Sequence, residues 1–461
     1  MYKQTVRLGI VPVKRSFLSL EEAVRQKKRL MAVIEKIISD PVEIVDVDDV
    51  APDGILYKTE HIEAAVQKLR SNQIDALFLS FCDFGEEEVA AGIATALNVP
   101  TLVWGARDER PNSDAVRGRD TQCGMFAATK VLRRCGVKYS YLYNVPPESP
   151  EFCRGIDRFL RVASILKTLQ GLRIAKIGAR PRPFMSVMAD EAALLSSFGI
   201  VTVPISPSEA VAAAKKLLET HDSALEDYFL DLSQRFICEE NSADVKKAAA
   251  LKIALGTLMQ EAGCTVAASE CWSVFPSLLG INPCLAMGEL ACEGTPIACE
   301  ADIHGAVTLA ILRACLLGQE TGFLADLTIR HPENDNAELL WHCGPFPYQL
   351  KSPACTARIV DGVQRFELRQ GNLTICRFDG IDGQYHLFAG EGHTTTGPET
   401  TGTYVWMEVE NWKRWEEHLM FGPYIHHVGG MYGHYLPVLR EAARLLGLKF
   451  DCAYEQGVYS L

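Results

Sequence analysis

The chain has 461 residues, which is too many for one hydrophobic core and predicts two to three domains. Hydrophobic residues make up 48% and charged residues 23%, as in an ordinary globular protein. The net charge of −12 argues against broad binding to a nucleic-acid backbone. No apolar stretch reaches the roughly 18 residues that a membrane-spanning helix needs, so neither nucleic acid nor membrane is expected as a partner.

The cysteine pattern and the N-terminal residues indicate in which cellular compartment the protein is expected. Fifteen cysteines are scattered singly, and none forms a CxxC pair. The opening "MYKQTVRLGIVPVKR" contains no apolar core of a secretory signal. These features predict reduced thiols in a cytoplasmic protein.

Strand-like and helix-like segments alternate in the first part of the chain. Predicted strands cover residues 6–13, 42–50, 75–84, 100–106 and 139–145. Predicted helices cover residues 19–39, with Ser19 as N-cap, and 61–71, 85–98 and 121–136. This alternation predicts a doubly wound, Rossmann-like α/β domain over residues 1–165, with ligands at the carboxyl ends of its strands.

A second α/β unit is predicted over residues 166–330. A strand in "GLRIAKIGARPRPF" precedes a helix over 186–199, a strand over 200–206 and a long helix from about 242 to 263. Neither unit has a GxGxxG turn after its first strand, so no dinucleotide binding is expected.

The sequence pattern changes after about residue 331. Short alternating runs separated by turns such as "DGID" predict an antiparallel sheet or small barrel over residues 331–461. One helix, over 435–447, is expected near the end.

Three separate segments carry candidate metal ligands. Glu300, Asp302 and His304 precede an apolar helix, where acids also serve as helix caps. Asp326 stands in "TGFLADLTIR", and His426 and His427 stand in the glycine-rich "FGPYIHHVGGMYGHY". Each residue alone is as consistent with a structural role. Two carboxylates and one imidazole from distant segments would suit Mn²⁺ or Mg²⁺ better than zinc.

Several motifs together resemble the L-fucose isomerase and L-arabinose isomerase superfamily, in a short fucose-isomerase-like branch. The similar segments, which occur in the family's order, are "GIVPVKRSFLSLEEAV", "WGARDERP", "CEADIHGAVTL", "FLADL", "WHCG" and "IHHVGG". The resemblance spans most of the chain and implies a metal-dependent aldose–ketose isomerase that works through a cis-enediol. Proton transfer between C1 and C2 of a sugar at a divalent metal would require no organic cofactor.

The resemblance also implies roles for particular residues. Glu300, Asp326 and His427 would bind Mn²⁺ or another divalent ion, and the two carboxylates would also carry the proton. Asp302 and His304 would then support the site without binding the metal.

Other residues would meet the sugar. Cys343, Trp406 and His426 would line the substrate pocket. Arg15 and Trp104 lie where the family closes the pocket of a neighbouring subunit, which implies a homo-oligomer, a trimer or hexamer, with active sites at subunit interfaces.

Departures from the family pattern suggest an altered substrate. Cys343 replaces a serine and His426 an asparagine. Cations cluster in three loops that follow predicted strands, namely Lys14 and Arg15, Arg107 and Arg110, and Arg180 and Arg182. Because arginine suits phosphate or sulfonate oxygens, these residues would fit a hexose with an anion at C6, and a neutral pentose or deoxyhexose is the other candidate substrate. The alternative is that they form ion pairs at subunit interfaces.

Two other functions remain open. A non-catalytic sugar-binding or regulatory protein could share the fold, but it would not need two acids and a histidine from separate segments. A metal hydrolase would more often show a motif such as HExxH, which the sequence lacks.

Overall fold

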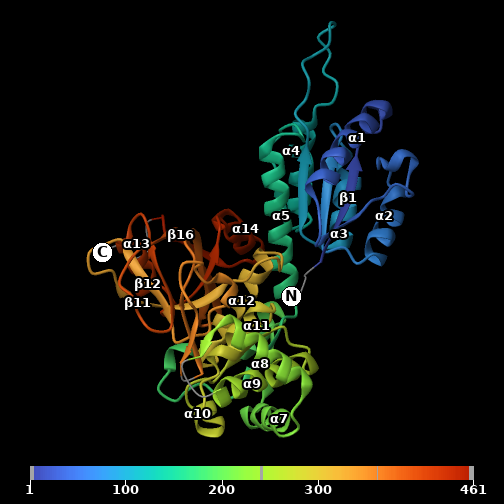
Figure 1. Ribbon diagram of the computed structural model, residues 1–461. Coiled ribbons are helices and arrows are strands. Elements are labelled where there is room, and N and C mark those ends of the chain that lie inside the picture. The colour runs from blue at the N-terminus through green and yellow to red at the C-terminus, as the bar shows by residue number, and fades with distance from the viewer. Residues whose placement is uncertain (1–4, 239–241, 361, 456–461) are drawn as a thin grey trace. The chain divides into compact units, whose positions relative to one another are not determined.

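The computed structural model describes residues 5–238, 242–360 and 362–455 (Figure 1). The chain divides into two compact units between Lys167 and Thr168. In the described ranges, no helix is both long and apolar enough to cross a membrane.

The N-terminal unit is built on a parallel sheet. Its strands, in the spatial order β2-β1-β3-β4-β5, are β1 (Val6–Val13), β2 (Val42–Val45), β3 (Ala76–Phe81), β4 (Thr101–Gly105) and β5 (Tyr139–Tyr141). The helices between them are α1 (Leu20–Ile37), α2 (Glu60–Ser71), α3 (Glu87–Leu97) and α4 (Thr121–Arg134). The Ser19 side chain accepts a hydrogen bond from the Glu22 amide, as predicted for the N-cap of α1. This strand order is that of a doubly wound fold, which confirms the prediction.

A long helix that the sequence analysis did not predict follows this sheet. Helix α5 (Pro150–Leu169) begins at proline, and the Ser149 hydroxyl accepts a hydrogen bond from the Phe152 amide at 3.2 Å. Serine followed by proline and glutamate is a common helix start, so the signal was present.

The second unit opens with another parallel sheet, in the order β10-β9-β6-β7. Its strands are β6 (Arg173–Ile177), β7 (Val201–Ile205), β9 (Val266–Ser269) and β10 (Ile297–Ala298). Its helices are α6 (Glu191–Phe198), α7 (Pro207–Glu219), α8 (Ser223–Arg235), α9 (Ser242–Glu261), α10 (Val274–Leu279) and α11 (Cys284–Cys292). The sheet repeats the doubly wound order of the N-terminal unit.

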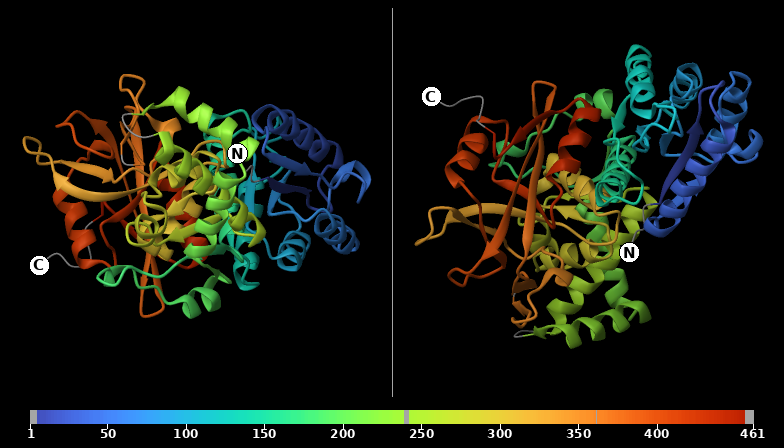
Figure 2. Two further views of the ribbon diagram at one scale, coloured as in Figure 1. Left: turned by 60° about the horizontal axis from the view of Figure 1, so that its bottom comes forward. Right: turned by 90° about the horizontal axis from the view of Figure 1, so that it is seen from above.

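A closed antiparallel barrel follows (Figure 2). Its strands, in order around the barrel, are β16 (Gln384–Thr395), β15 (Asn372–Ile381), β18 (His427–Tyr432), β11 (Phe323–Arg330), β12 (Ala337–His342) and β17 (Thr403–Glu408), and β17 pairs back to β16. The predicted antiparallel barrel is therefore confirmed. Strand β11 lies before residue 331, and the division into compact units does not separate the barrel from the central sheet, so the domain boundaries at 165 and 330 stay predictions.

Short elements extend the barrel. They are β8 (Ile237–Cys238), β13 (Arg358–Val360), β14 (Val363–Glu367), β19 (Lys449–Cys452), α13 (Trp412–Phe421) and α14 (Leu436–Leu446). The β15–β16 hairpin turns at Asp382 and Gly383, whose φ values are 52° and 74°. Both angles are positive, as a two-residue hairpin turn requires, which explains the Asp-Gly sequence there.

Helix α12 (Ile303–Cys315) joins the central sheet to the barrel. All of its residues are buried, and it packs against β9 and β10 on one side and β15 and β18 on the other. The start of α12 therefore lies where the edge of the parallel sheet meets the barrel.

Candidate active site

Glu300 lies in a short turn at the carboxyl end of β10. Its φ and ψ of 53° and 28° are left-handed, and the φ of Ala301 is 54°. This backbone costs a non-glycine residue on the order of 1–3 kcal/mol, and such strain often accompanies functional sites. The side chain of Asp302 ends the turn by accepting a hydrogen bond from the Gly305 amide at 2.8 Å, which caps α12.

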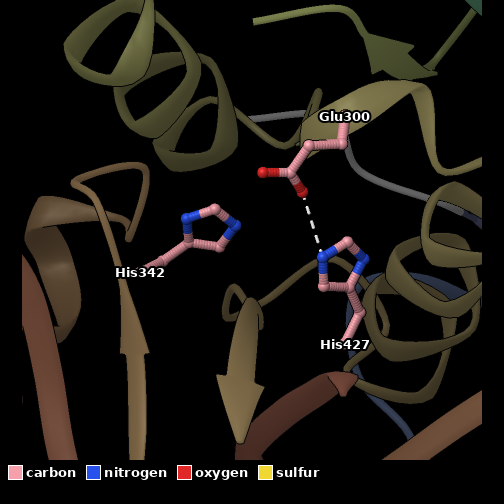
Figure 3. A group of neighbouring side chains, drawn as sticks. All are labelled: Glu300, His342 and His427. Carbon is pink, nitrogen blue, oxygen red and sulfur yellow. Dashed lines mark ion pairs between the residues drawn. The ribbon is translucent and has the colours of Figure 1, made fainter. Parts of the chain in front are cut away.

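Asp326 and His427 are directly opposite each other on β11 and β18. Directly opposed residues of antiparallel strands point to the same face, so the two side chains lie together. His427 Nε2 is 3.0 Å from Glu300 Oε2 and 3.4 Å from Asp326 Oδ1. The structure thus brings each of the two predicted carboxylates to the predicted histidine, and Figure 3 shows the Glu300 carboxylate directed at the His427 ring.

A buried ionic network lies behind His427. Its Nδ1 donates to Asp302 Oδ2 at 2.8 Å, and Arg377 contacts the same carboxylate at 2.5 Å and 3.1 Å. Arg377 also binds Asp379, whose Oδ1 is 2.7 Å from His304 Nδ1. Asp302 therefore supports the metal candidate His427 while it caps the helix.

His342, at the end of β12, is a further member of the cluster that the sequence analysis did not single out. Its side chain is 2% exposed, and its Nε2 is 3.9 Å from Asp326 Oδ1. Figure 3 shows its ring on the strand beside Glu300 and His427. Ligand atoms of Glu300, His342 and His427 lie within 4.8 Å of one another, as a metal site requires.

Four buried polar atoms of this cluster have no hydrogen-bond partner: Glu300 Oε2, Asp326 Oδ1, His342 Nε2 and His427 Nε2. Nearly all buried polar groups in proteins are paired, so several unpaired ones at one point mark a place for a missing ligand. Two carboxylate oxygens and two imidazole nitrogens suit a divalent cation.

The pKa values of the two histidines show how strongly the cluster favours positive charge. Burial alone would lower the pKa of His427, but its hydrogen bond to Asp302 and the neighbouring Glu300 carboxylate raise that pKa to about 9. Burial likewise opposes protonation of His342, whereas the charge of Asp326 raises its pKa to about 10. Burial would raise the pKa of Asp302, but Arg377 holds it well below its usual range. Without a metal, protons on the imidazoles supply the positive charge that the carboxylates require.

His426, a predicted substrate residue, lies at the rim of the cluster. It forms a second candidate metal group with Asp326 and His427. Burial and the neighbouring charge of His427 lower its pKa. The ring of Phe184 packs 5.7 Å from His426 and 6.0 Å from His427. Residues 178–188, which follow β6, therefore cover the histidines, and Arg180 and Arg182 belong to this same loop.

Cys343, another predicted substrate residue, follows His342 directly. Its backbone nitrogen lies 2.9 Å from His342 Nδ1, and its Sγ lies 3.3 Å from that nitrogen and 3.3 Å from Cys284 Sγ. Hydrogen bonds from the thiols of Cys284 and Cys299 lower the pKa of Cys343.

Trp406, the remaining predicted substrate residue of this unit, is 1% exposed. Its indole N–H donates to Pro398 O at 2.9 Å, and its ring meets His331 at 4.9 Å. Trp341, and not Trp406, is the tryptophan directly opposite a cluster residue, because it is paired with Asp326 across β11 and β12. The role of Trp406 as a substrate wall stays a prediction.

The last two predicted residues belong to the N-terminal unit. Arg15 Nη1 is 2.8 Å from Glu86 and Nη2 is 3.6 Å from Glu87, so its charge is paired within the unit. Trp104, at the end of β4, is 2% exposed and packs 4.6 Å from Phe152. Their role in closing a neighbouring pocket also stays a prediction.

An open cavity lies at the carboxyl ends of β4 and β5 in the N-terminal unit. Its volume is about 660 Å³, and its lining residues are Arg107, Asp108, Gln122, Tyr143, Asn144, Val145 and Glu151. Such sheet edges are the usual ligand positions in doubly wound folds.

The chain is similar to known sugar isomerases. A family model described as the N-terminal domain of fucose/sulfoquinovose isomerase matches residues 9–170. Sulfoquinovose isomerases of Priestia aryabhattai and Priestia megaterium are each 26% identical over 458 residues, covering 97% of this chain and 99% of theirs. That of Alkalicoccus urumqiensis is 26% identical over 366 residues, covering 77% of this chain and 80% of its own.

A solved structure adds nothing to this comparison. The periplasmic solute-binding protein of Actinobacillus succinogenes with bound D-allose is 13% identical and covers 63% of this chain and 83% of its own. Its TM-score of 0.17 is too low to bear on the fold or the function.

The full-length relatives and the matched N-terminal domain place the chain among the sugar isomerases, the intramolecular oxidoreductases that interconvert aldoses and ketoses. Residues 9–170 match the fucose/sulfoquinovose isomerase family, in agreement with the resemblance of the motifs, and the relatives matched over the full length are sulfoquinovose isomerases.

Proposed function

We propose that this protein is a metal-dependent aldose–ketose isomerase that acts on a hexose with an anionic group at C6, such as a sulfonate or phosphate. The observation that carries the proposal is that buried atoms of Glu300, Asp326 and His342 without hydrogen-bond partners surround His427 Nε2, which has none either. Hard oxygen ligands combined with imidazole favour Mn²⁺ as the bound ion.

Each residue of the cluster has a part in the proposed reaction. Glu300, Asp326 and His427 would hold the metal, with His342 Nε2 as a further ligand. A divalent ion held there would supply Lewis-acid polarisation of the C1 and C2 oxygens of the sugar. One carboxylate, Glu300 or Asp326, takes the C–H proton while the other protonates oxygen, so that hydrogen moves between C1 and C2 through a cis-enediol. Asp302 holds the His427 ring in place throughout.

The anionic substrate is supported by the loop over the histidines. Phe184 touches both rings of the His426–His427 pair, and Arg182, two residues earlier, is exposed. A guanidinium in this loop could bind sulfonate or phosphate oxygens with two hydrogen bonds. The relatives named sulfoquinovose isomerase act, by that name, on a sugar with such an anion.

We further propose that the enzyme is a homo-oligomer, a trimer or hexamer, with active sites at subunit interfaces. Residues 109–118 are exposed throughout, and Figure 1 shows this segment as a long arm that projects from the N-terminal unit. An arm of this kind is suited to contact a second copy of the chain. Light scattering that finds a fully active monomer would reject the assembly.

The function is tested with metal-depleted protein and a panel of aldoses. The panel contains glucose, L-fucose, L-arabinose, glucose 6-phosphate and 6-deoxy-6-sulfoglucose, and the product is identified by NMR. We expect ketose to form after Mn²⁺ is added and to stop forming when the ion is chelated, with the C6-anionic sugars turned over fastest. Sugar binding without conversion would favour the non-catalytic alternative, and conversion that survives chelation would reject the metal mechanism.

A further inference from the structure

A row of thiols runs beside the metal cluster in the second unit. Cys343 Sγ is in contact with Cys284 Sγ at 3.3 Å. The thiols of Cys271 and Cys343 influence the pKa of Cys299 and raise it, which places these groups near one another. Singly buried thiols are ordinary core residues, but two sulfur atoms in direct contact beside a metal cluster are not explained by packing alone.

The two ends of the Cys284–Cys343 contact differ in exposure. Cys284 is 3% exposed and begins helix α11, whereas Cys343 is half-buried in the loop that follows β12. An oxidant can therefore reach Cys343, and the buried thiol of Cys284 lies in contact with it. This is the arrangement of a reactive cysteine with a resolving partner.

We propose that Cys343 and Cys284 form an oxidation site, which a peroxide converts to a disulfide that switches off the enzyme. The Cys343 thiolate attacks one peroxide oxygen, so that an S–O bond forms, the O–O bond breaks and hydroxide leaves as water after protonation. Cys284 then loses its proton and attacks the resulting sulfenic acid; the S–S bond forms, the S–O bond breaks and a second water leaves. Both cysteines are oxidised, and the peroxide is reduced. A dithiol reverses the change by thiol–disulfide exchange.

The disulfide would act on the candidate site through His342. A disulfide holds its sulfur atoms at about 2.05 Å, so the two sulfurs must move together by more than 1 Å. Because Cys284 is fixed in a buried helix, the movement falls on the loop of Cys343. That loop provides both groups that contact His342 Nδ1, namely the Cys343 amide and thiol. The imidazole would lose this support and with it the position of Nε2.

The disulfide is tested on the full-length protein, treated with hydrogen peroxide and then quenched. Peptide mapping under non-reducing conditions should find Cys284 joined to Cys343, and denatured protein should lose two of its 15 free thiols. The crosslink is read without an activity assay, so it stands or falls independently of the proposed function, on which only the loss of isomerase activity rests. Activity should fall at least tenfold and recover with dithiothreitol.

Two variants identify the partner. Cys284→Ser should form no crosslink, and its Cys343 should instead pass from the sulfenic to the sulfinic acid, so that dithiothreitol no longer restores activity. Cys264→Ser, which removes a buried thiol outside the row, should behave like wild type. If mapping finds Cys343 joined to Cys299, or if Cys284→Ser is inactivated as fast and as reversibly as wild type, the assignment is overturned. Unchanged thiol content after peroxide treatment would overturn it as well.

Discussion

Asp302 joins His427 to Arg377: one of its carboxylate oxygens is 2.8 Å from His427 Nδ1 and 2.5 Å from the guanidinium. Since Asp302 accepts the Nδ1 proton, a neutral His427 presents the lone pair of Nε2 to the cluster. Arg377 is fully buried and keeps Asp302 ionised. Asp302, at the start of α12, thus both caps the helix and supports a candidate metal ligand.

Replacing Asp302 by asparagine should weaken metal binding without breaking the helix cap. The amide oxygen can still accept from Gly305, but the negative charge that holds the His427 ring is lost. We expect Mn²⁺ affinity, measured by calorimetry, to fall about 10- to 100-fold, as is usual when such a supporting group is removed.

A matched control separates this effect from general destabilisation. Glu289 is also a buried carboxylate bound to an arginine, with Arg235 at 2.6 Å, but it is not part of the metal cluster. Glu289→Gln should lower the melting temperature and leave Mn²⁺ affinity unchanged. Wild-type affinity in Asp302→Asn would show that Asp302 serves only the fold.

Metal binding should release protons. The pKa values of about 9 for His427 and about 10 for His342 mean that both rings are protonated at pH 7 in the metal-free protein. A ligand imidazole must be neutral, so about two protons should leave per ion and affinity should rise as the pH increases from 7 to 9. Calorimetry in buffers of different ionisation enthalpy counts the protons.

The same experiment tests the place of His342. In His342→Ala the release should fall to about one proton, since only His427 then needs to lose one. An unchanged count would mean that His342 does not bind the ion. A wild-type protein that releases no proton would contradict the ligand set as a whole.

Anion recognition should depend on Arg182 and not on Arg15. Arg15 is already paired with Glu86 and Glu87, whereas Arg182 is exposed in the loop over the histidines. Arg182→Ala should lose one charge-assisted contact, about 1.5–3 kcal/mol, in kcat/KM for the C6-anionic sugar only. Arg15→Ala serves as the comparison and should affect neutral and anionic sugars alike. An equal loss for both sugars in Arg182→Ala would reject this assignment.

The fold was largely predictable because its signals are local. Alternating strands and amphipathic helices indicated both doubly wound sheets, and alternation with turns indicated the barrel. Helix α5 was missed although Ser149 and Pro150 mark its start. The exact hairpin turn was also missed, since the turn lies at Asp382 and Gly383, one Asp-Gly pair later than the "DGID" segment suggests.

The candidate site was only partly predictable because the barrel assembles it. Glu300, Asp326 and His427 came from motif resemblance, and no local pattern shows that Asp326 and His427 are cross-strand neighbours. His342 was overlooked, although it stands in the quoted "WHCG" segment, because its approach to Asp326 depends on how β12 pairs with β11. Phe184 was missed for a related reason: the loop after β6 meets the histidines only in three dimensions.

The most direct test of the central claim is to measure Mn²⁺ content and isomerase turnover together in Glu300→Gln. The substitution keeps the size of the side chain but removes the charge 3.0 Å from His427 Nε2. A folded variant with weakened Mn²⁺ binding and turnover reduced at least a thousandfold, about 4 kcal/mol, is the predicted result. A folded Glu300→Gln protein that binds Mn²⁺ and converts aldose to ketose at the wild-type rate would contradict the account.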